Sequence, residues 1–233
     1  KKMPGRVMGS FFDGPDGGRL THAQTRELAE LLARLHGMQL EVFGDLIHRF
    51  DDPALLNDSI EQYARRTMAG WRRYADQSGC LPSPLFVYLM RWLEDTVPKD
   101  ARRPVLLHGD YSIHNLLAEN GHVTAVLDWE GSMFGAPELD LSFVQSTLAK
   151  YIDWEGFVEH YVGCGGRPPV QESIDYYRAF YDMRVVLSAA LAARNVQAGA
   201  TRDIRLAMFE LGLHPHFMEE ALASTSGYPL KEE

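Results

Sequence analysis

Three oxygen-bearing side chains near the middle of the chain have the types and the spacing that phosphoryl transfer requires. Asp110 is followed five positions later by Asn115, and Asp128 stands at the end of the next apolar run. A carboxylate can accept or orient the proton of an attacking hydroxyl, and amide and carboxylate oxygens are ligands that Mg²⁺ prefers. This order of residues therefore predicts a site that brings a hydroxyl, a phosphate and a metal ion together.

The spacing within this segment is the one that protein kinases use. Their catalytic loop reads H-R-D-x-x-x-x-N, and a later Asp begins the sequence D-F-G. Here His108-Gly109-Asp110 precedes Asn115 by the same interval, and Asp128-Trp129-Glu130 follows. A fixed H-G-D-x-x-x-x-N arises by chance about once per 10⁵ start positions at ordinary composition. A coincidental surface turn is therefore a poor explanation.

Short strands must position this loop. Residues 104–107 form a brief apolar run, and residues 122–127 form a β-branched one that follows the turn signal Asn120-Gly121. The strands flank the loop, which predicts small β-hairpins around it.

The remaining chain has mostly helical patterns. Thr21 and Gln24 form a capping box, and the apolar stripe that follows ends at Gly37. Further helices are predicted over residues 85–96 and 176–197. The fold class expected from these patterns is α+β and mostly α.

These motifs resemble those of the aminoglycoside phosphotransferase and choline kinase-like superfamily, which has HGD in place of HRD and D-[WFIL]-E in place of DFG. The resemblance runs from residue 1 to about residue 212 and implies the large C-terminal lobe of a protein-kinase-like fold. Four outer segments are also similar to the superfamily: Met3-Pro4-Gly5 to the end of its inter-lobe hinge, Leu32–His36 to its first large-lobe helix, Gly135–Leu141 to its G-x-P-x-x-D-L segment, and Tyr176–Arg184 to the late helix of a branch found beside acyl-CoA dehydrogenases.

The resemblance implies a role for each residue of the central motif. Asp110 is similar to the catalytic base that accepts or orients the substrate proton, and His108 to the histidine that fixes the loop by bonding backbone near the metal-binding Asp. Asn115 and Asp128 are similar to the magnesium ligands.

The resemblance also implies three contacts with the nucleotide. Leu117 and Leu127 match the apolar positions that form the floor of the adenine pocket. Ser112 stands where many kinases place a basic residue near the γ-phosphate, so its hydroxyl is expected to donate one hydrogen bond there without adding charge.

Four polar residues keep two interpretations each. Asp140 resembles an acid that ties down the catalytic loop, but it could equally be a helix N-cap. We expect His36 to be a packed, hydrogen-bonded histidine rather than a ligand, and His114 to be a solvent-facing loop residue rather than a substrate contact. Glu130 could face a cationic substrate or a water molecule, or have no function.

The extent of the chain suggests that part of the enzyme is missing. A kinase of this type also needs a phosphate-covering loop, a strand Lys and a helix Glu that pairs with it. Only two residues precede Met3, so we expect the N-terminal β lobe to be absent from the sequence. On this basis residues 1–19 are the end of the hinge and a linker, and residues 20–233 are the helical lobe. Within that lobe, residues 41–100 are expected to form a substrate wall, and residues 104–130 the catalytic loop and metal Asp.

The implied activity is transfer of the γ-phosphoryl group of ATP or GTP to a hydroxyl of a small molecule, either an aminoglycoside-like antibiotic or a metabolite. A catalytically incomplete single-lobe binding module is an alternative. A metal-dependent hydrolase, with zinc on His108, Asp110 and His114, is another. The Asp-to-Asn spacing and the later Asp128 argue against the hydrolase. The acceptor and the oligomeric state stay open.

Composition limits the partners. The net charge of −9 argues against nucleic acid, whose phosphates require a basic surface. No run reaches the roughly 18 apolar residues of a membrane span, so no membrane partner is expected. The two cysteines lack zinc-ligand spacing and are expected to be reduced thiols of a cytoplasmic protein.

Overall fold

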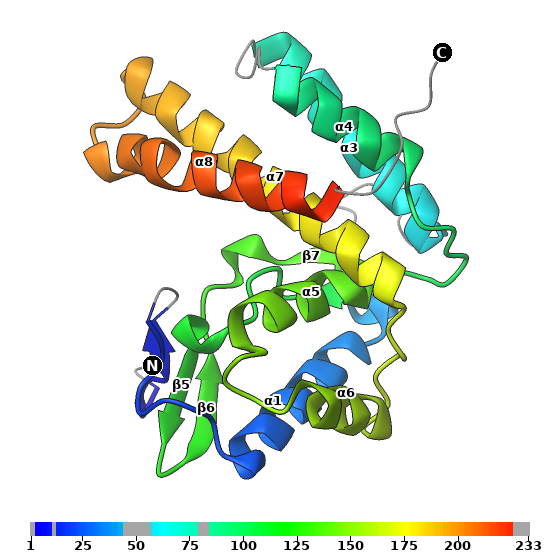
Figure 1. Cartoon of the computed structure of the whole chain (residues 1–233), viewed down its shortest axis with the longest axis vertical. Helices are drawn as coiled ribbons and strands as arrows, with labels where there is room; N and C mark the ends of the chain where they lie inside the picture. Colours follow the sequence, from blue (N-terminus) through cyan, green and yellow to red (C-terminus); the bar gives the residue numbers. More distant parts are fainter. Residues whose placement is uncertain (1–2, 11–12, 44–56, 79–83, 226–233) are drawn as a thin grey trace. The chain divides into compact units, whose positions relative to one another are not determined.

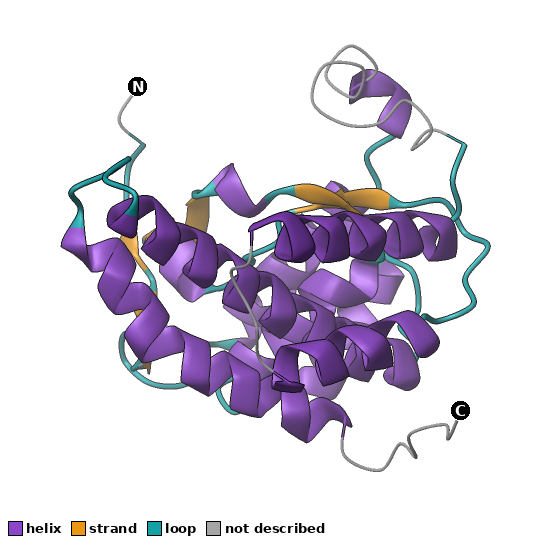
Figure 2. Ribbon diagram, turned by 90° about the horizontal axis from the view of Figure 1, so that it is seen from above, coloured by secondary structure: helices purple, strands orange, loops and turns teal. Residues whose placement is uncertain are grey.

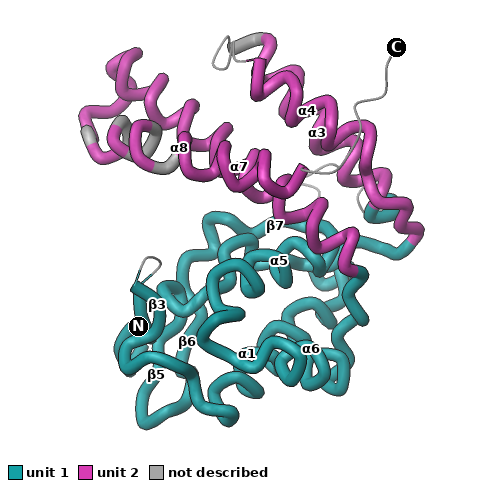
Figure 3. Tube along the Cα trace, in the orientation of Figure 1, with its two compact units in different colours: residues 1–60, 102–170 teal, residues 61–101, 171–233 magenta. Residues whose placement is uncertain are grey.

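The computed structural model of the chain describes residues 3–10, 13–43, 57–78 and 84–225. Helices predominate in these residues and the strands are few and short (Figure 2), in agreement with the expected fold class. The chain divides into two compact units (Figure 3): residues 1–60 with 102–170, and residues 61–101 with 171–233. No helix in the described ranges is both long and apolar enough to cross a membrane.

The largest sheet belongs to unit 1 and has the order β1-β5-β6, all antiparallel. It consists of β1 (Arg6–Val7), β5 (Leu116–Glu119) and β6 (His122–Val126), and β5 and β6 lie side by side in Figure 1. Asn120 (φ 53°) and Gly121 (φ 83°) connect β5 to β6 with two positive φ angles, as a tight type I′ hairpin requires. The predicted turn and the strand after it are therefore confirmed.

The described residues of unit 1 also form two further strand pairs. β4 (Val105–Leu107) pairs with β7 (Met133–Gly135), and β2 (Gly9–Ser10) pairs with β3 (Gly14–Pro15). The segment interpreted as a linker over residues 1–19 thus contains β1, β2 and β3. Its Gly, Pro and Asp content favours loops, but pairing of β1 with β5 gives its backbone partners that lie far along the chain.

Helices pack against these sheets. α1 (His22–His36) begins at Thr21 with the predicted capping box and lies alongside α6 (Trp154–Gly163), as Figure 1 shows. α5 (Pro137–Leu148) starts with a proline, whose missing N–H costs nothing at this position. A 3₁₀ turn, η1 (Leu40–Phe43), follows α1.

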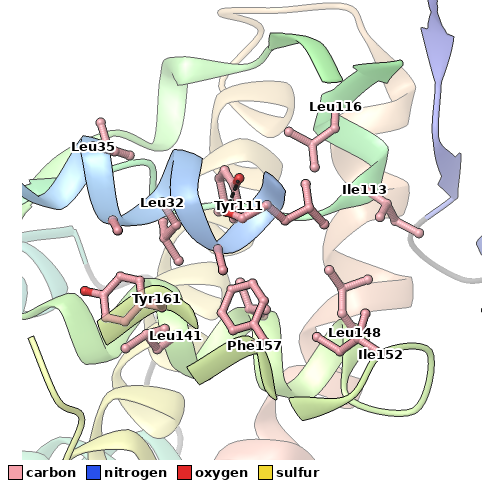
Figure 4. Packing of buried hydrophobic residues seen from close by; sticks show 14 of the residues in the cluster. Leu32, Leu35, Tyr111, Ile113, Leu116, Leu141, Leu148, Ile152, Phe157 and Tyr161 are labelled. Atoms are coloured by element: carbon pink, nitrogen blue, oxygen red, sulfur yellow. Dashed lines mark hydrogen bonds between the residues drawn. The ribbon is translucent and has the colours of Figure 1, made fainter. Parts of the chain in front are cut away.

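The core of unit 1 contains part of the predicted catalytic segment (Figure 4). Tyr111, Ile113 and Leu116 are buried against α1, α5 and α6, and the Tyr111 hydroxyl donates to the Leu28 carbonyl at 3.0 Å. Burying side chains of this size stabilises a fold by about 1.5–3 kcal/mol each. Packing of the apolar residues therefore holds the polar residues between them in place.

The described residues of unit 2 form four helices: α3 (Ile60–Ser78), α4 (Pro84–Asp95), α7 (Gln171–Gln197) and α8 (Ile204–Thr225). The first residue of α3, Ile60, belongs to unit 1. α7 packs against both α8 and α4. In the first turns of α7, the Tyr176 hydroxyl donates to the Leu93 carbonyl at 3.1 Å, and the Tyr176 ring stacks on Trp92. The predicted helices at residues 85–96 and 176–197 correspond to α4 and α7.

The predicted substrate wall over residues 41–100 lies partly outside the described residues. Residues 44–56 and 79–83, with Cys80, lie outside the described residues. The described remainder is mainly α3 and α4, which group with α7 and α8 in unit 2. The role of this segment as a substrate wall stays a prediction.

Candidate active site

The side chains of Asp110 and Asn115 are joined directly. Asn115, at the end of the 3₁₀ turn η3 (Ile113–Asn115), uses its Nδ2 to donate to the Asp110 carbonyl at 3.0 Å and to Asp110 Oδ2 at 2.8 Å. His114 Nε2 lies 3.3 Å from the same Oδ2. Asn115 is buried whereas Asp110 is partly exposed, so a buried amide aims a carboxylate that solvent can reach.

His108 connects the start of this loop to the end of β6. Its Nε2 lies 2.8 Å from the Leu127 carbonyl, and its Nδ1 accepts the Asp110 N–H at 3.3 Å. Since Nδ1 is an acceptor, the ring proton is on Nε2, which donates to Leu127. The indole of Trp129 lies 4.7 Å from the buried imidazole, measured between ring centroids. The predicted hydrogen bond from His108 to the backbone near Asp128 is present. Both ring nitrogens of His108 are therefore hydrogen-bonded, Nε2 to the Leu127 carbonyl and Nδ1 to the Asp110 N–H.

Asp140 holds the backbone of the candidate catalytic loop and is not an N-cap. It lies inside α5, whose N-cap is Ala136, and its two carboxylate oxygens accept the backbone N–H groups of His108 and Gly109 at 2.8 Å each. Oδ2 also lies 3.2 Å from His36 Nε2. Burial raises the pKa of Asp140, but the hydrogen bond and charge of His36 and the two N–H donors outweigh it and hold the pKa below its ordinary value.

Asp128 follows β6 and turns the chain sharply. Its backbone is left-handed (φ 58°, ψ 64°), a conformation that Asp adopts more readily than most residues but that still costs energy. The turn leads into η4 (Trp129–Gly131) and leaves the Asp128 side chain exposed. Its carboxylate makes no hydrogen bond to any described residue.

The oxygens of Asn115 and Asp128 suit a magnesium ion. The Asn115 amide donates through Nδ2, and its Oδ1 accepts no hydrogen bond from the described part of the chain. Two hard oxygen donors fit Mg²⁺, which usually completes its shell with water and substrate phosphates.

Among the residues that the structure describes, no group of three or more His, Cys, Asp or Glu side chains is placed to hold a metal. The zinc-hydrolase alternative needs His108 as a ligand, but both ring nitrogens of His108 are hydrogen-bonded within the protein. The geometry therefore does not support that alternative.

Leu117 and Leu127 lie on one face of the β1-β5-β6 sheet. Leu117 is opposite Ala125, and Leu127 follows Ala125 by two positions, so strand alternation places all three on the same side. Leu116 points the other way and is fully buried, whereas Leu117 and Leu127 are partly exposed. Val7, opposite Leu117 on β1 and 42% exposed, extends this apolar face. Nothing in the sequence pattern near residue 7 indicates that pairing.

Ser112 differs from expectation, and His114 agrees with it only in part. Ser112 is only 1% exposed and its hydroxyl donates to Thr147 Oγ1 at 3.1 Å, which does not favour the expected contact with a phosphate. His114 was expected to face solvent; its side chain is partly exposed, and its Nε2 lies beside the Asp110 carboxylate. Glu130 is exposed next to Asp128.

Two surface pockets of unit 1 lie away from the catalytic loop. One of about 530 Å³ lies between α1 and α6, and one of about 260 Å³ is lined by His36, Arg103 and Arg167. Neither is lined by Asp110, Asn115 or Asp128.

Comparison with known proteins agrees with the geometry. Residues 1–173 match the phosphotransferase enzyme family (APH). Acyl-CoA dehydrogenase family member 11 of Gallus gallus is 30% identical over 125 residues, which cover 49% of this chain and 16% of that protein. A Ralstonia eutropha structure described as a candidate aminoglycoside phosphotransferase aligns with a TM-score of 0.72 at 20% identity, over 97% of this chain and 72% of the other. A spectinomycin phosphotransferase in complex with ADP and spectinomycin has a TM-score of 0.54 at 16% identity, over 92% and 70%.

These comparisons differ in what they establish. At such low identities, the similarity to solved structures establishes the fold alone. The chain spans only about a sixth of the chicken relative. The family match, in contrast, covers most of the chain and includes every residue of the candidate site. The resemblance inferred from the central motif is confirmed: the chain belongs to the phosphotransferase enzyme family.

Proposed function

We propose that the protein transfers the γ-phosphoryl group of ATP or GTP to a hydroxyl group of a small molecule. The observation that carries the proposal is the pair formed by Asn115 and Asp110. The Nδ2 group of Asn115 aims the Asp110 carboxylate at 2.8 Å, and its Oδ1 remains available for a cation. On this proposal, one side chain would keep the base and a metal ligand next to each other.

In the proposed reaction, the hydroxyl group of the acceptor binds to Asp110. Its carboxylate accepts a hydrogen bond from the substrate hydroxyl and then its proton, while the hydroxyl oxygen bonds to the γ-phosphorus. The bond from that phosphorus to the bridging oxygen breaks, and the nucleoside diphosphate leaves with the electron pair. The proton on Asp110 later returns to solvent, which is accessible because this side chain is partly exposed.

Asn115 and Asp128 would hold Mg²⁺ through the oxygens that bond to nothing else in the described chain. Bound magnesium supplies positive charge that offsets the charge of the nucleotide phosphates. The two hydrogen bonds from Asn115 to Asp110 would keep the metal ligand close to the base. Such preorganisation is the main contribution that a protein makes to phosphoryl transfer.

The nucleotide base would rest on the apolar face formed by Leu117, Leu127 and Val7. The ADP complex of the spectinomycin phosphotransferase supports nucleotide use by this fold. The acceptor is a small molecule with a hydroxyl group, either an aminoglycoside-like antibiotic or a metabolite. A cytoplasmic location stays a prediction from the sequence.

A substrate panel tests the proposal. The full-length protein is incubated with Mg²⁺ and ATP or GTP, and nucleoside diphosphate release is followed with aminoglycosides, sugars, amino alcohols and hydroxy amino acids. We expect one class to stimulate release, and Asp110→Asn to lower that rate by roughly 10²–10⁴. Asp16→Asn, which removes an exposed carboxylate of the same unit, serves as the control. Acceptor-dependent release that survives in Asp110→Asn would refute the assignment. Nucleotide binding without any acceptor-dependent release would favour the binding-module alternative.

A further inference from the structure

The side chain of His114 lies directly beside the carboxylate of the proposed catalytic base. Its Nε2 is 3.3 Å from Oδ2 of Asp110, and the two side chains are 23% and 28% exposed, respectively. A carboxylate oxygen can only accept a hydrogen bond, so the ring nitrogen that faces it carries a hydrogen and donates. The reaction proposed above uses Asp110, Asn115 and Asp128, and it gives this ring no role.

Packing against buried residues restricts where the His114 ring can lie. Phe143, on α5 and only 2% exposed, meets the ring edge to face, with the ring centroids 6.4 Å apart and the ring planes at 84°. Aromatic pairs favour this separation and this angle. The preceding residue, Ile113, is 1% exposed in the core of unit 1. The imidazole therefore presents its Nε2 to Asp110 from a buried support.

Two side chains thus converge on one oxygen of Asp110. Asn115 Nδ2 approaches Oδ2 at 2.8 Å, and His114 Nε2 approaches the same atom at 3.3 Å. A carboxylate held by one donor can still turn about its Cβ–Cγ bond, whereas two donors on separate side chains oppose that rotation. Orientation matters here because a general base acts only when it lies within hydrogen-bond reach of the proton that it accepts.

We infer that His114 is a positioning residue for phosphoryl transfer, which together with Asn115 holds the Asp110 carboxylate in the orientation that meets the acceptor hydroxyl. The kinetic consequence of this inference rests on the proposed function. Its structural consequence, a hydrogen bond from His114 that holds the Asp110 carboxylate, stands without that function.

Two substitutions of equal length separate the hydrogen bond of His114 from its packing. The side-chain nitrogen of Gln extends about as far as Nε2 of His, so His114→Gln can still donate to Asp110, whereas His114→Met fills similar space without a donor. We expect kcat of the Gln variant to stay within about threefold of the natural protein. The Met variant should lose roughly 10- to 100-fold in kcat with little change in KM for acceptor or nucleotide, because a displaced catalytic group slows chemistry more than binding.

The control is the same pair of substitutions at His22, an exposed residue at the start of α1. His22→Gln and His22→Met should leave both kcat and KM unchanged.

A double-mutant cycle in urea unfolding examines the same contact without a substrate. The folding equilibrium constants of His114→Gln and His114→Met are compared in the natural background and in Asp110→Ala. The ratio of the Gln value to the Met value should be about 3- to 10-fold larger when Asp110 is present, which is the usual worth of one hydrogen bond. Differences in packing between Gln and Met cancel, because they are common to the two backgrounds.

Each outcome decides the inference. Equal kcat losses in the Gln and Met variants would overturn it, because packing would then be the cause, and so would natural kcat in the Met variant. A loss confined to the KM of the acceptor would mean that His114 contacts the acceptor instead of positioning Asp110. If the natural protein shows no phosphoryl transfer, the proposed function fails, while the unfolding cycle still decides whether His114 holds Asp110. Equal ratios in the two backgrounds would show that it does not.

Discussion

The Nδ2 group of Asn115 donates at 2.8 Å to the carboxylate of Asp110 and at 3.0 Å to the carbonyl of the same residue. The two bonds use both hydrogens of the amide, and its oxygen is left to face elsewhere. An Asp at position 115 would keep oxygen ligands for a metal but could not donate. Position 115 therefore needs an amide side chain to donate hydrogen bonds to Asp110, and not only to bind a metal.

This relationship gives the first prediction. Asn115→Asp should lower kcat about 100-fold or more at neutral pH, because two carboxylates this close raise the pKa of one of them and leave the pair sharing a proton. The acidic limb of the pH–rate profile should move to higher pH. Steady-state kinetics from pH 5 to 9 check this, with the exposed Asn195→Asp as control. An unshifted profile with natural kcat would show that the donor role of Asn115 is unimportant.

The second prediction concerns the metal. Asp128→Asn keeps a residue type that tolerates the left-handed backbone (φ 58°) but removes a charge, so the fold should be retained. We expect the Mg²⁺ concentration for half-maximal activity to rise by about tenfold or more, and excess Mg²⁺ to restore activity only in part. Magnesium titrations of the rate, beside Asp16→Asn, measure this. Unchanged magnesium dependence would remove Asp128 from the ligand set.

A third prediction concerns the stability of unit 2. Burial raises the pKa of Asp182 on α7 to about 7, against the attraction of Arg178, whose Nε lies 3.1 Å from Oδ2. The folded state therefore keeps a proton up to about pH 7 that the unfolded chain releases near its ordinary pKa of 3.8. The folded state binds more protons across this interval, so the free energy of unfolding falls as pH rises through it.

Asp182→Asn should remove that dependence. The amide cannot ionise and can still accept from Arg178, whose second partner, Glu220, remains 2.7 Å away. At pH 8 the variant should equal the natural protein in stability or exceed it by roughly 1–3 kcal/mol, with no such gain at pH 5. Urea unfolding at the two pH values measures this. The control is Asp175→Asn, an exposed position on the same helix. A variant that is less stable at pH 8 would mean that the ion pair outweighs its burial.

The sequence predicted the parts of the site that depend on local spacing. The interval from Asp110 to Asn115, the turn at Asn120-Gly121 and the strand before Asp128 lie within twenty residues, and short-range geometry determines how they meet. The capping box at Thr21 is of the same kind. Each of these elements forms where the residue pattern predicted it.

The features that sequence alone did not determine depend on distant partners. Asp140 had two equal interpretations because its role is decided by where α5 places it relative to His108. The β1 strand was interpreted as linker because it is stabilised by β5 and not by its own composition. Ser112 was assigned to phosphate because nothing local indicates that Thr147 would take its hydroxyl.

The last prediction uses two adjacent leucines on opposite faces of β5. Leu116 is fully buried in the core of unit 1, whereas Leu117 lies on the partly exposed face with Leu127. Leu116→Ala leaves a cavity and should cost about 2–5 kcal/mol of stability. Leu117→Ala removes apolar surface that a nucleotide base would cover, so it should weaken nucleotide binding by about tenfold and change stability little. Calorimetric titration of the full-length protein with Mg²⁺ and nucleotide, together with thermal unfolding, compares the two variants. If Leu117→Ala binds nucleotide as tightly as the natural protein, the base does not rest on this face of the sheet, and the assignment of Leu117 and Leu127 to the nucleotide is wrong.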